Sequence, residues 1–158
     1  MSIYYYNAEQ FLPINIDEAW NFFSSAKNLS VITPPEMGFK IITDLDNKQI
    51  YEGMLIEYTV KPLFGIPLHW QTEIFKVNKP QIFADRQLKG PYKAWEHTHT
   101  FIEKENGVLM HDQVKYQLPF GMIGRITHSL LVRKKIENIF IYRRKALEKI
   151  FENGNNNN

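Results

Sequence analysis

The sequence predicts an α+β domain in which helices pack on one face of an antiparallel sheet. Two observations lead to this class. Most of the chain consists of short segments in which apolar and polar residues alternate, the period-2 pattern of half-buried strands. The last part of the chain changes to the 3.6-residue period of an amphipathic helix. Because the strands follow one another without helices between them, we expect hairpin connections and an antiparallel sheet.

The first elements of the chain are a strand and two short helices. Residues 3–12 are rich in β-forming side chains and predict a strand that Pro13 ends. Asp17 is the expected N-cap of a short helix, because the segment EAWNFF after it carries apolar residues at helical spacing. A second short helix is expected over residues 27–32, and a strand over residues 39–43.

The middle of the chain predicts the rest of the sheet. Further strands are expected over residues 54–60, 68–74, 82–88, 93–104 and 108–118. The first two show the alternation most clearly, because Tyr58 and Trp70 each lie on the apolar face of their strand. Asn106-Gly107 predicts a hairpin turn between the last two strands. The segment KPLFGIP at 61–67 predicts a turn or mobile loop with exposed apolar residues.

The C-terminal part predicts one long helix over residues 122–151, with a possible break at 121–124. Its apolar stripe consists of Ile126, Ser129, Ile136, Phe140, Leu147 and Phe151. Arg125 and His128 fall in its first turns, where they could stand at the mouth of a pocket, although a solvated face is the simpler interpretation.

Length and composition limit the classes of function. We expect one domain over residues 1–152 and a disordered polar tail over 153–158. Nineteen basic and seventeen acidic residues argue against a nucleic-acid partner. No signal peptide is visible, and no apolar run approaches the roughly 18 residues of a membrane span, so no integral membrane association is expected. The chain has no cysteine, which excludes disulfides and thiolate ligands and is consistent with a cytoplasmic protein.

One strand, in the segment GPYKAWEHTHTF, carries two histidines on a single face. Alternation places Trp95, His97, His99 and Phe101 together, and Glu96, Thr98 and Thr100 on the opposite face. The face with the large rings is expected inward, because burying such a ring contributes roughly 1.5–3 kcal/mol.

These histidines could belong to a metal site or to a pocket. With Asp112 on the following strand, His97 and His99 would form a set of two histidines and one carboxylate. Nothing in the sequence supplies partners that would orient these ligands. We therefore expect no metal and no cofactor, and histidines that line a pocket or hydrogen-bond to polar neighbours.

A buried ion pair is expected between the last strand and the terminal helix. Asp112 alternates with apolar residues, so it points inward, where a carboxylate needs a partner to stay ionised. Arg143 lies in the middle of the apolar stripe of the helix and must find an anion. Asp85, Glu96 and Asp112 are the possible acceptors. The pair could fix the helix to the sheet, or Arg143 could anchor a ligand.

Several segments together resemble bacterial members of the START/Bet v 1-like (SRPBCC) superfamily, over about residues 3–151. They are LPINIDEAWNFFSSAKNLSVITPPEMGFKI, IPLHWQTEI, FADRQLKGPYKAWEHTHTF and GVLMHDQVKYQLPFGMIGRITHSLLVRKKIENIFIYRRKAL. They look most like its ligand-binding branch, which is related to polyketide cyclase/dehydrase-type domains. The resemblance implies the helix-grip fold, in which a curved antiparallel sheet wraps a long C-terminal helix around a cavity.

We therefore expect a binding module for a small hydrophobic or amphipathic molecule. The aromatic cavity walls would be Tyr58, Trp70, Trp95, Tyr116 and Phe140, and polar groups would come from His97, His99, Asp112 and Arg143. One alternative is an enzyme of cyclase or isomerase type, in which His97 or Asp112 moves protons. The other is a protein-interaction or regulatory module with residues 61–67 as contact surface, which predicts little cavity.

Overall fold

The computed structural model describes residues 2–45, 48–61, 65–119 and 131–151. Within these residues the strands form one seven-stranded antiparallel sheet in the order β1-β7-β6-β5-β4-β3-β2. The elements in chain order are β1 (Ile3–Leu12), α1 (Ile16–Phe23), the 3-10 helices η1 (Ala26–Ser30) and η2 (Pro35–Met37), β2 (Lys40–Ile41), β3 (Leu55–Val60), β4 (Leu68–Asn78), β5 (Ile82–Lys89), β6 (Ala94–Lys104), β7 (Gly107–Gln117) and α3 (Arg133–Phe151). The first strand pairs with the last, and hairpins build the rest of the sheet.

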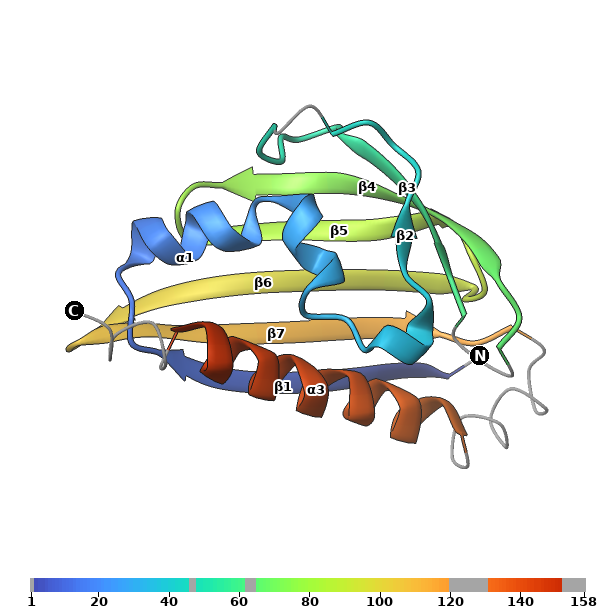
Figure 1. The fold of residues 1–158 in the computed structure, drawn as a ribbon. Helices are drawn as coiled ribbons and strands as arrows, with labels where there is room; N and C mark the ends of the chain where they lie inside the picture. Colours follow the sequence, from blue (N-terminus) through green and yellow to red (C-terminus); the bar gives the residue numbers. More distant parts are fainter. Residues whose placement is uncertain (1, 46–47, 62–64, 120–130, 152–158) are drawn as a thin grey trace.

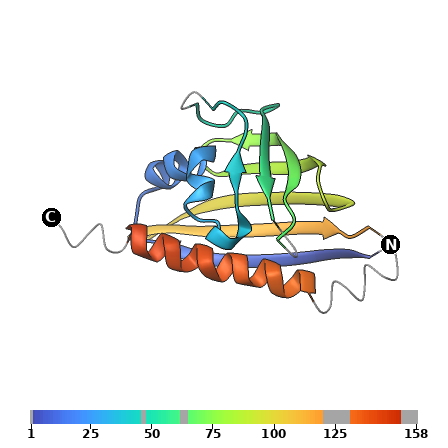
Figure 2. The same cartoon turned by 45° about the vertical axis from the view of Figure 1, so that its right-hand side comes forward.

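The sheet curves, and the helices of the described residues lie on its concave face (Figure 1). Both views show α3 running alongside β1 and β7, while α1 and the 3-10 helices cover another part of the same face (Figures 1 and 2). The expected α+β class and helix-grip architecture are confirmed. None of the helices in the described residues is long and apolar enough to span a membrane.

The N-cap of α1 is Asn15 and not Asp17. The Asn15 side chain accepts a hydrogen bond of 2.9 Å from the Glu18 backbone N–H, and the Glu18 carboxylate accepts one of 3.1 Å from the Asn15 N–H. This reciprocal pair is a capping box. Asp17 instead lies in the first turn, where its charge suits the positive end of the helix dipole.

The strand expected over residues 39–43 is only Lys40–Ile41. Beyond it the N–H groups of Ile42 and Thr43 both donate to the Glu57 carbonyl, so the regular ladder ends.

The hairpin turn is also displaced from its expected position. Its central residues are Glu105 and Asn106, and Asn106 has a φ of 64°. Gly107 pairs with Lys104 and opens β7. A side chain at Gly107 would meet the Leu12 carbonyl and the Phe11 ring, so close approach of β1 requires glycine here.

The described part of the terminal helix keeps the expected stripe, with Ile136, Phe140, Arg143 and Leu147 buried. Several expectations fall outside the described residues. These are the break at 121–124, the stripe positions Ile126 and Ser129, the mouth candidates Arg125 and His128, the whole tail at 153–158, and residues 62–64 of the segment 61–67.

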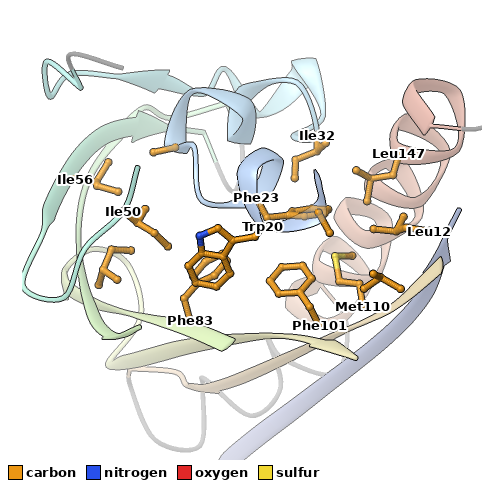
Figure 3. Packing of buried hydrophobic residues seen from close by; sticks show 14 of the residues in the cluster. Leu12, Trp20, Phe23, Ile32, Ile50, Ile56, Phe83, Phe101, Met110 and Leu147 are labelled. Atoms are coloured by element: carbon orange, nitrogen blue, oxygen red, sulfur yellow. The ribbon is translucent and has the colours of Figure 1, made fainter. Parts of the chain in front are cut away.

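The larger cluster of buried hydrophobic residues includes the contacts of α1 and of the C-terminal half of α3 with the sheet (Figure 3). The Trp20 ring stands edge-on to Phe83, with centroids 5.8 Å apart, and edge-on to Phe101 at 6.2 Å. At the other end of α3, Ile136 and Phe140 pack in a second cluster on β7. A cavity is left between the helices and the strands β3 to β6.

Candidate ligand cavity and its polar wall

The cavity has a volume of about 190 Å³. Its sheet side comes from inward-facing residues of β3, β4, β5 and β6, the strands that α3 does not cover. Its other side comes from Phe22 and Phe23 at the end of α1, from the segment between α1 and β2, and from α3, which contributes Lys135, Ile136, Ile139 and Arg143.

One part of the lining is aromatic, and we call Tyr58, Trp70, Tyr92 and Trp95 the aromatic wall. Tyr58 and Trp70 are directly paired across β3 and β4, and their rings stack with centroids 5.8 Å apart. Trp95 stands edge-on to Trp70 at 5.5 Å, and Tyr92 contacts both tryptophans. Burial raises the pKa of Tyr58 and of Tyr92, so both hydroxyls stay protonated at neutral pH.

A polar wall closes the other part of the sheet side, and it consists of Asp85, His97 and His99. The sheet register brings these residues together, because Asp85 on β5 pairs with His97 on β6. His99 lies two residues further along the same face of β6, and its Nε2 is 3.7 Å from Asp85 Oδ2. One ligand atom from each of the three residues lies within 4.8 Å of the other two.

Asp112 lies behind this wall on β7 and joins both histidines to α3. Its Oδ1 is 2.9 Å from His97 Nε2, 2.8 Å from His99 Nδ1 and 3.4 Å from Arg143 Nη1. The His97 contact is a hydrogen bond, whereas the His99 N–H does not point directly at the oxygen, so that contact is mainly electrostatic.

The structure thus identifies Asp112 as the acceptor that Arg143 requires. Both side chains are buried, with Asp112 1% and Arg143 5% exposed. The guanidinium also lies over the Phe140 ring, 4.8 Å from its centroid. The other acceptors considered do not fill this role, because Glu96 pairs with Lys115 and Asp85 faces His99.

The two histidines of the polar wall and Asp112 have perturbed pKa values. Burial would raise the pKa of Asp112, but the Arg143 charge and the contacts from the two histidines hold it well below its usual range. Burial, together with the neighbouring His99, lowers the pKa of His97 to about 4. Burial also opposes the charge on His99, but its contacts with Asp112 and Asp85 outweigh burial and raise its pKa.

These shifts determine the tautomer of His97. Asp112 is ionised and can only accept, so neutral His97 donates through its Nε2–H. Its Nδ1 therefore carries a lone pair. Two other polar atoms of the polar wall, His99 Nε2 and Asp85 Oδ2, face each other and not Asp112.

The expected ligand-binding residues divide into two groups. Tyr58, Trp70, Trp95, His97, His99 and Arg143 line the cavity. Asp112, Tyr116 and Phe140 do not, because the inward face of β7 is covered by α3, and these side chains pack at that interface. The inward orientation of the Trp95–Phe101 face is confirmed, since His97, His99 and Phe101 are all buried.

Other lining residues were not expected in the cavity. Thr72 and Asp85 could have been found, because each alternates with an apolar inward residue on its strand. Tyr92 precedes β6, so no sequence period marks it. Ile139 lies three residues after Ile136 on the helix, so the helical period gives its face but does not say that it reaches the cavity.

Solved structures share this fold, although no protein-family model and no curated protein matches the sequence. The di-domain ARO/CYC StfQ from the steffimycin biosynthetic pathway matches with a TM-score of 0.72 at 8% identity, over 98% of this chain and 52% of that one. Protein CV1439 from Chromobacterium violaceum matches with a TM-score of 0.69 at 12% identity, over 94% and 96% of the two chains. A norcoclaurine synthase from Thalictrum, in complex with a transition-state analogue, matches with a TM-score of 0.65 at 14% identity, over 94% and 96%.

These likenesses show the fold. The chain has the helix-grip fold of the START/Bet v 1-like (SRPBCC) superfamily, as the sequence resemblance implied.

Proposed function

We propose that this chain is a cytoplasmic protein that binds a small hydrophobic or amphipathic molecule in the cavity between the sheet and α3. The observation that carries the proposal is a cavity with an aromatic wall and a polar wall on the same sheet face. The ligand's apolar body would lie against Trp70 and Trp95, and its polar end would face His97, His99 or Arg143. Structural neighbours named as an ARO/CYC of the steffimycin biosynthetic pathway and as norcoclaurine synthase support a fold used for such molecules.

The volume indicates the size of the ligand. Pockets for drug-sized ligands span roughly 300–1,000 Å³, and this cavity has about 190 Å³. We therefore expect a molecule of one or two rings rather than a long acyl chain or a large polycycle.

Two buried hydrogen-bond donors indicate the chemistry of the ligand's polar end. Trp70 Nε1 and Arg143 Nε are buried and have no hydrogen-bond acceptor among the described residues, and both residues line the cavity. A buried donor without an acceptor costs roughly 1–3 kcal/mol. A ligand carrying an oxygen acceptor would remove part of this cost.

Native mass spectrometry of the protein purified from its own host tests the proposal. We expect a retained small molecule that is released on denaturation, and after its removal a hydrophobic fluorescent probe that binds and changes tryptophan emission. If no molecule is retained and no apolar probe binds the emptied protein, the proposal is wrong.

A cyclase or isomerase is the second candidate, favoured by the pair His97 and His99. Adjacent groups whose pKa values are pushed apart are the usual arrangement of an acid and a base. His99 would donate a proton, and the lone pair of His97 Nδ1 would accept one. Asp112 would be a positioning residue, because it does not line the cavity.

The retained molecule discriminates between the two functions. An enzyme would convert it, or exchange its hydrogens with deuterium from D2O, and His97→Gln or His99→Gln would abolish this while probe binding persists. A carrier would return the molecule unchanged. A module that acts only through protein contacts needs no such cavity, so the cavity argues for one of the first two functions.

A further inference from the structure

We propose that Asp85, His97 and His99 form a binding site for one divalent transition-metal ion, of the zinc or ferrous type, on the polar wall of the cavity. This inference goes beyond ligand binding, which does not require a metal. It also departs from the metal-free pocket expected from sequence, because the structure supplies what the sequence lacked.

The three residues are placed as ligands of one ion. His97 and His99 project from the same face of β6, and Asp85 is the cross-strand partner of His97 on β5. Metal–ligand distances of about 2.0–2.2 Å place tetrahedral ligand atoms roughly 3.5 Å apart. Here the atoms lie within 4.8 Å of one another, and His99 Nε2 is already 3.7 Å from Asp85 Oδ2. Small side-chain rotations would close the site.

Each proposed ligand has a neighbour beside its other polar atom, through a hydrogen bond for His97 and Asp85 and through an electrostatic contact for His99. Asp112 contacts His97 Nε2 and His99 Nδ1, and the Thr72 hydroxyl donates to Asp85 Oδ1 at 3.3 Å. This leaves His97 Nδ1, His99 Nε2 and Asp85 Oδ2 for the ion. Metal-binding histidines almost always donate their second N–H to a carboxylate, carbonyl or water. Asp112, considered from sequence as a ligand, fits this outer role instead.

Charge and donor type determine which ions suit the site. Arg143 balances the charge of Asp112, so the three ligands contribute one negative charge from Asp85. Two imidazoles and one carboxylate suit zinc, iron or cobalt and do not suit calcium or magnesium, which prefer oxygen ligands. Because all three residues line the cavity, a further coordination position would face its interior. A water molecule or an oxygen of a bound molecule could occupy that position.

Cobalt titration tests the site directly. The protein is stripped with a chelator, dialysed and titrated with Co2+, whose visible absorption reports histidine and carboxylate coordination, and Zn2+ is then added as competitor. We expect one Co2+ per chain, displaced by one Zn2+. Asp85→Asn keeps the size of the side chain but removes its charge, so we expect it to weaken binding roughly tenfold or more. Thr72→Val leaves all three ligands in place and should give a smaller loss.

His69→Ala is the matched control, because His69 is an exposed histidine that also lies near a carboxylate, 3.4 Å from Glu57. It should bind Co2+ as tightly as the wild type. Wild-type protein that takes up no Co2+ overturns the proposal. So does wild-type affinity in Asp85→Asn, or an equal loss in Asp85→Asn and His69→Ala. Circular dichroism verifies that each variant is folded, and His99→Gln replaces Asp85→Asn if that variant is not. Apolar-probe binding in the same samples shows separately whether the cavity proposal stands.

Discussion

Asp112 is the residue on which the polar interior depends, because one of its oxygens contacts both histidines and Arg143. It therefore links β6, β7 and α3 in a region that the sheet and helix keep from solvent. A buried pair of this kind contributes little net stability, since desolvation offsets most of the attraction. Losing one partner alone is costly, because the other charge is then buried without compensation.

We expect Arg143→Met to lower the free energy of unfolding by roughly 3 kcal/mol or more. Asp112 would keep only the histidines as partners. The double variant Arg143→Met/Asp112→Leu should recover much of the loss, because neither buried charge remains. Urea unfolding of both variants measures the coupling, with Lys145→Met, an exposed position on the same helix, as control. Purely additive losses would show that the two charges do not depend on each other.

The histidines predict how stability changes with pH in metal-free protein. The pKa of His97 falls from 6.5 to about 4 on folding, so the unfolded chain binds more protons between these values. The contribution of His97 to the free energy of unfolding is therefore fully present above pH 6.5 and is lost as the pH falls toward 4. The loss is roughly 3 kcal/mol, at 1.36 kcal/mol per pKa unit. The raised pKa of His99 acts in the opposite sense, and its contribution is lost as the pH rises through the folded value.

Stability should therefore be greatest near pH 6.5 when unfolding is followed with a chelator present. His97→Gln should flatten the acid side of the profile, and His69→Ala should leave it unchanged. An equally steep loss between pH 6.5 and 4 in His97→Gln would assign the loss to other groups. Asp112 would not be one of them, because its own contribution disappears only below its unfolded pKa of 3.8.

At the scale of the elements, two substitutions at the start of α1 distinguish the two candidate N-caps. Asn15→Ala should cost about 1 kcal/mol, because it removes the acceptor for the Glu18 N–H and breaks the capping box. Asp17→Ala should cost only a few tenths of a kcal/mol, since it loses a favourable charge near the helix dipole. Thermal or urea unfolding of both variants gives the comparison. A larger loss of unfolding free energy from Asp17→Ala would mean that Asp17 is the N-cap, as expected from sequence.

The elements also show what the sequence could predict. Strand faces were predictable because alternation has a period of two, so Trp70, His97 and Asp112 were all placed on the inward side. The N-cap of α1 was predictable, because Asn15 lies three residues before Glu18, which is the spacing of a capping box. Asp17 was nevertheless the residue expected from sequence. The short β2 was not predictable, because it ends where two N–H groups share the Glu57 carbonyl, a tertiary contact.

Which inward residues reach the cavity depends on where α3 lies across the sheet. Tyr116 and Phe140 are as apolar as the aromatic wall, yet they pack where α3 covers β7 and β1. Sequence periodicity assigns a face to a residue but does not say which helix covers it. Asp112 illustrates the same limit, because it faces inward but lies behind the two histidines.

Over the whole molecule, the largest core cluster borders the cavity, because Phe23, Ile56 and Phe83 belong to that cluster and also line the cavity. Trp20 and Phe101 lie deeper in the cluster and do not line the cavity (Figure 3). Ile139 of α3 lines the cavity and is not one of the buried core residues. This separation predicts that a substitution at Ile139 costs less stability than a substitution at Trp20 or Phe101.

Two tryptophan substitutions on α3 test this separation. Ile139 lines the cavity, whereas Ile141 lies on the outer side of the same helix and is 52% exposed. In Ile139→Trp the larger ring should occupy much of the about 190 Å³ and weaken apolar-probe binding at least tenfold, while the urea midpoint changes little, because the ring fills space that was empty. Ile141→Trp adds the same ring to solvent and should change neither quantity. Fluorescence titration measures probe affinity in both variants. Equal probe binding in the two would mean that the probe binds outside the cavity. A large loss of stability in Ile139→Trp alone would mean that the interior around Ile139 is tightly packed.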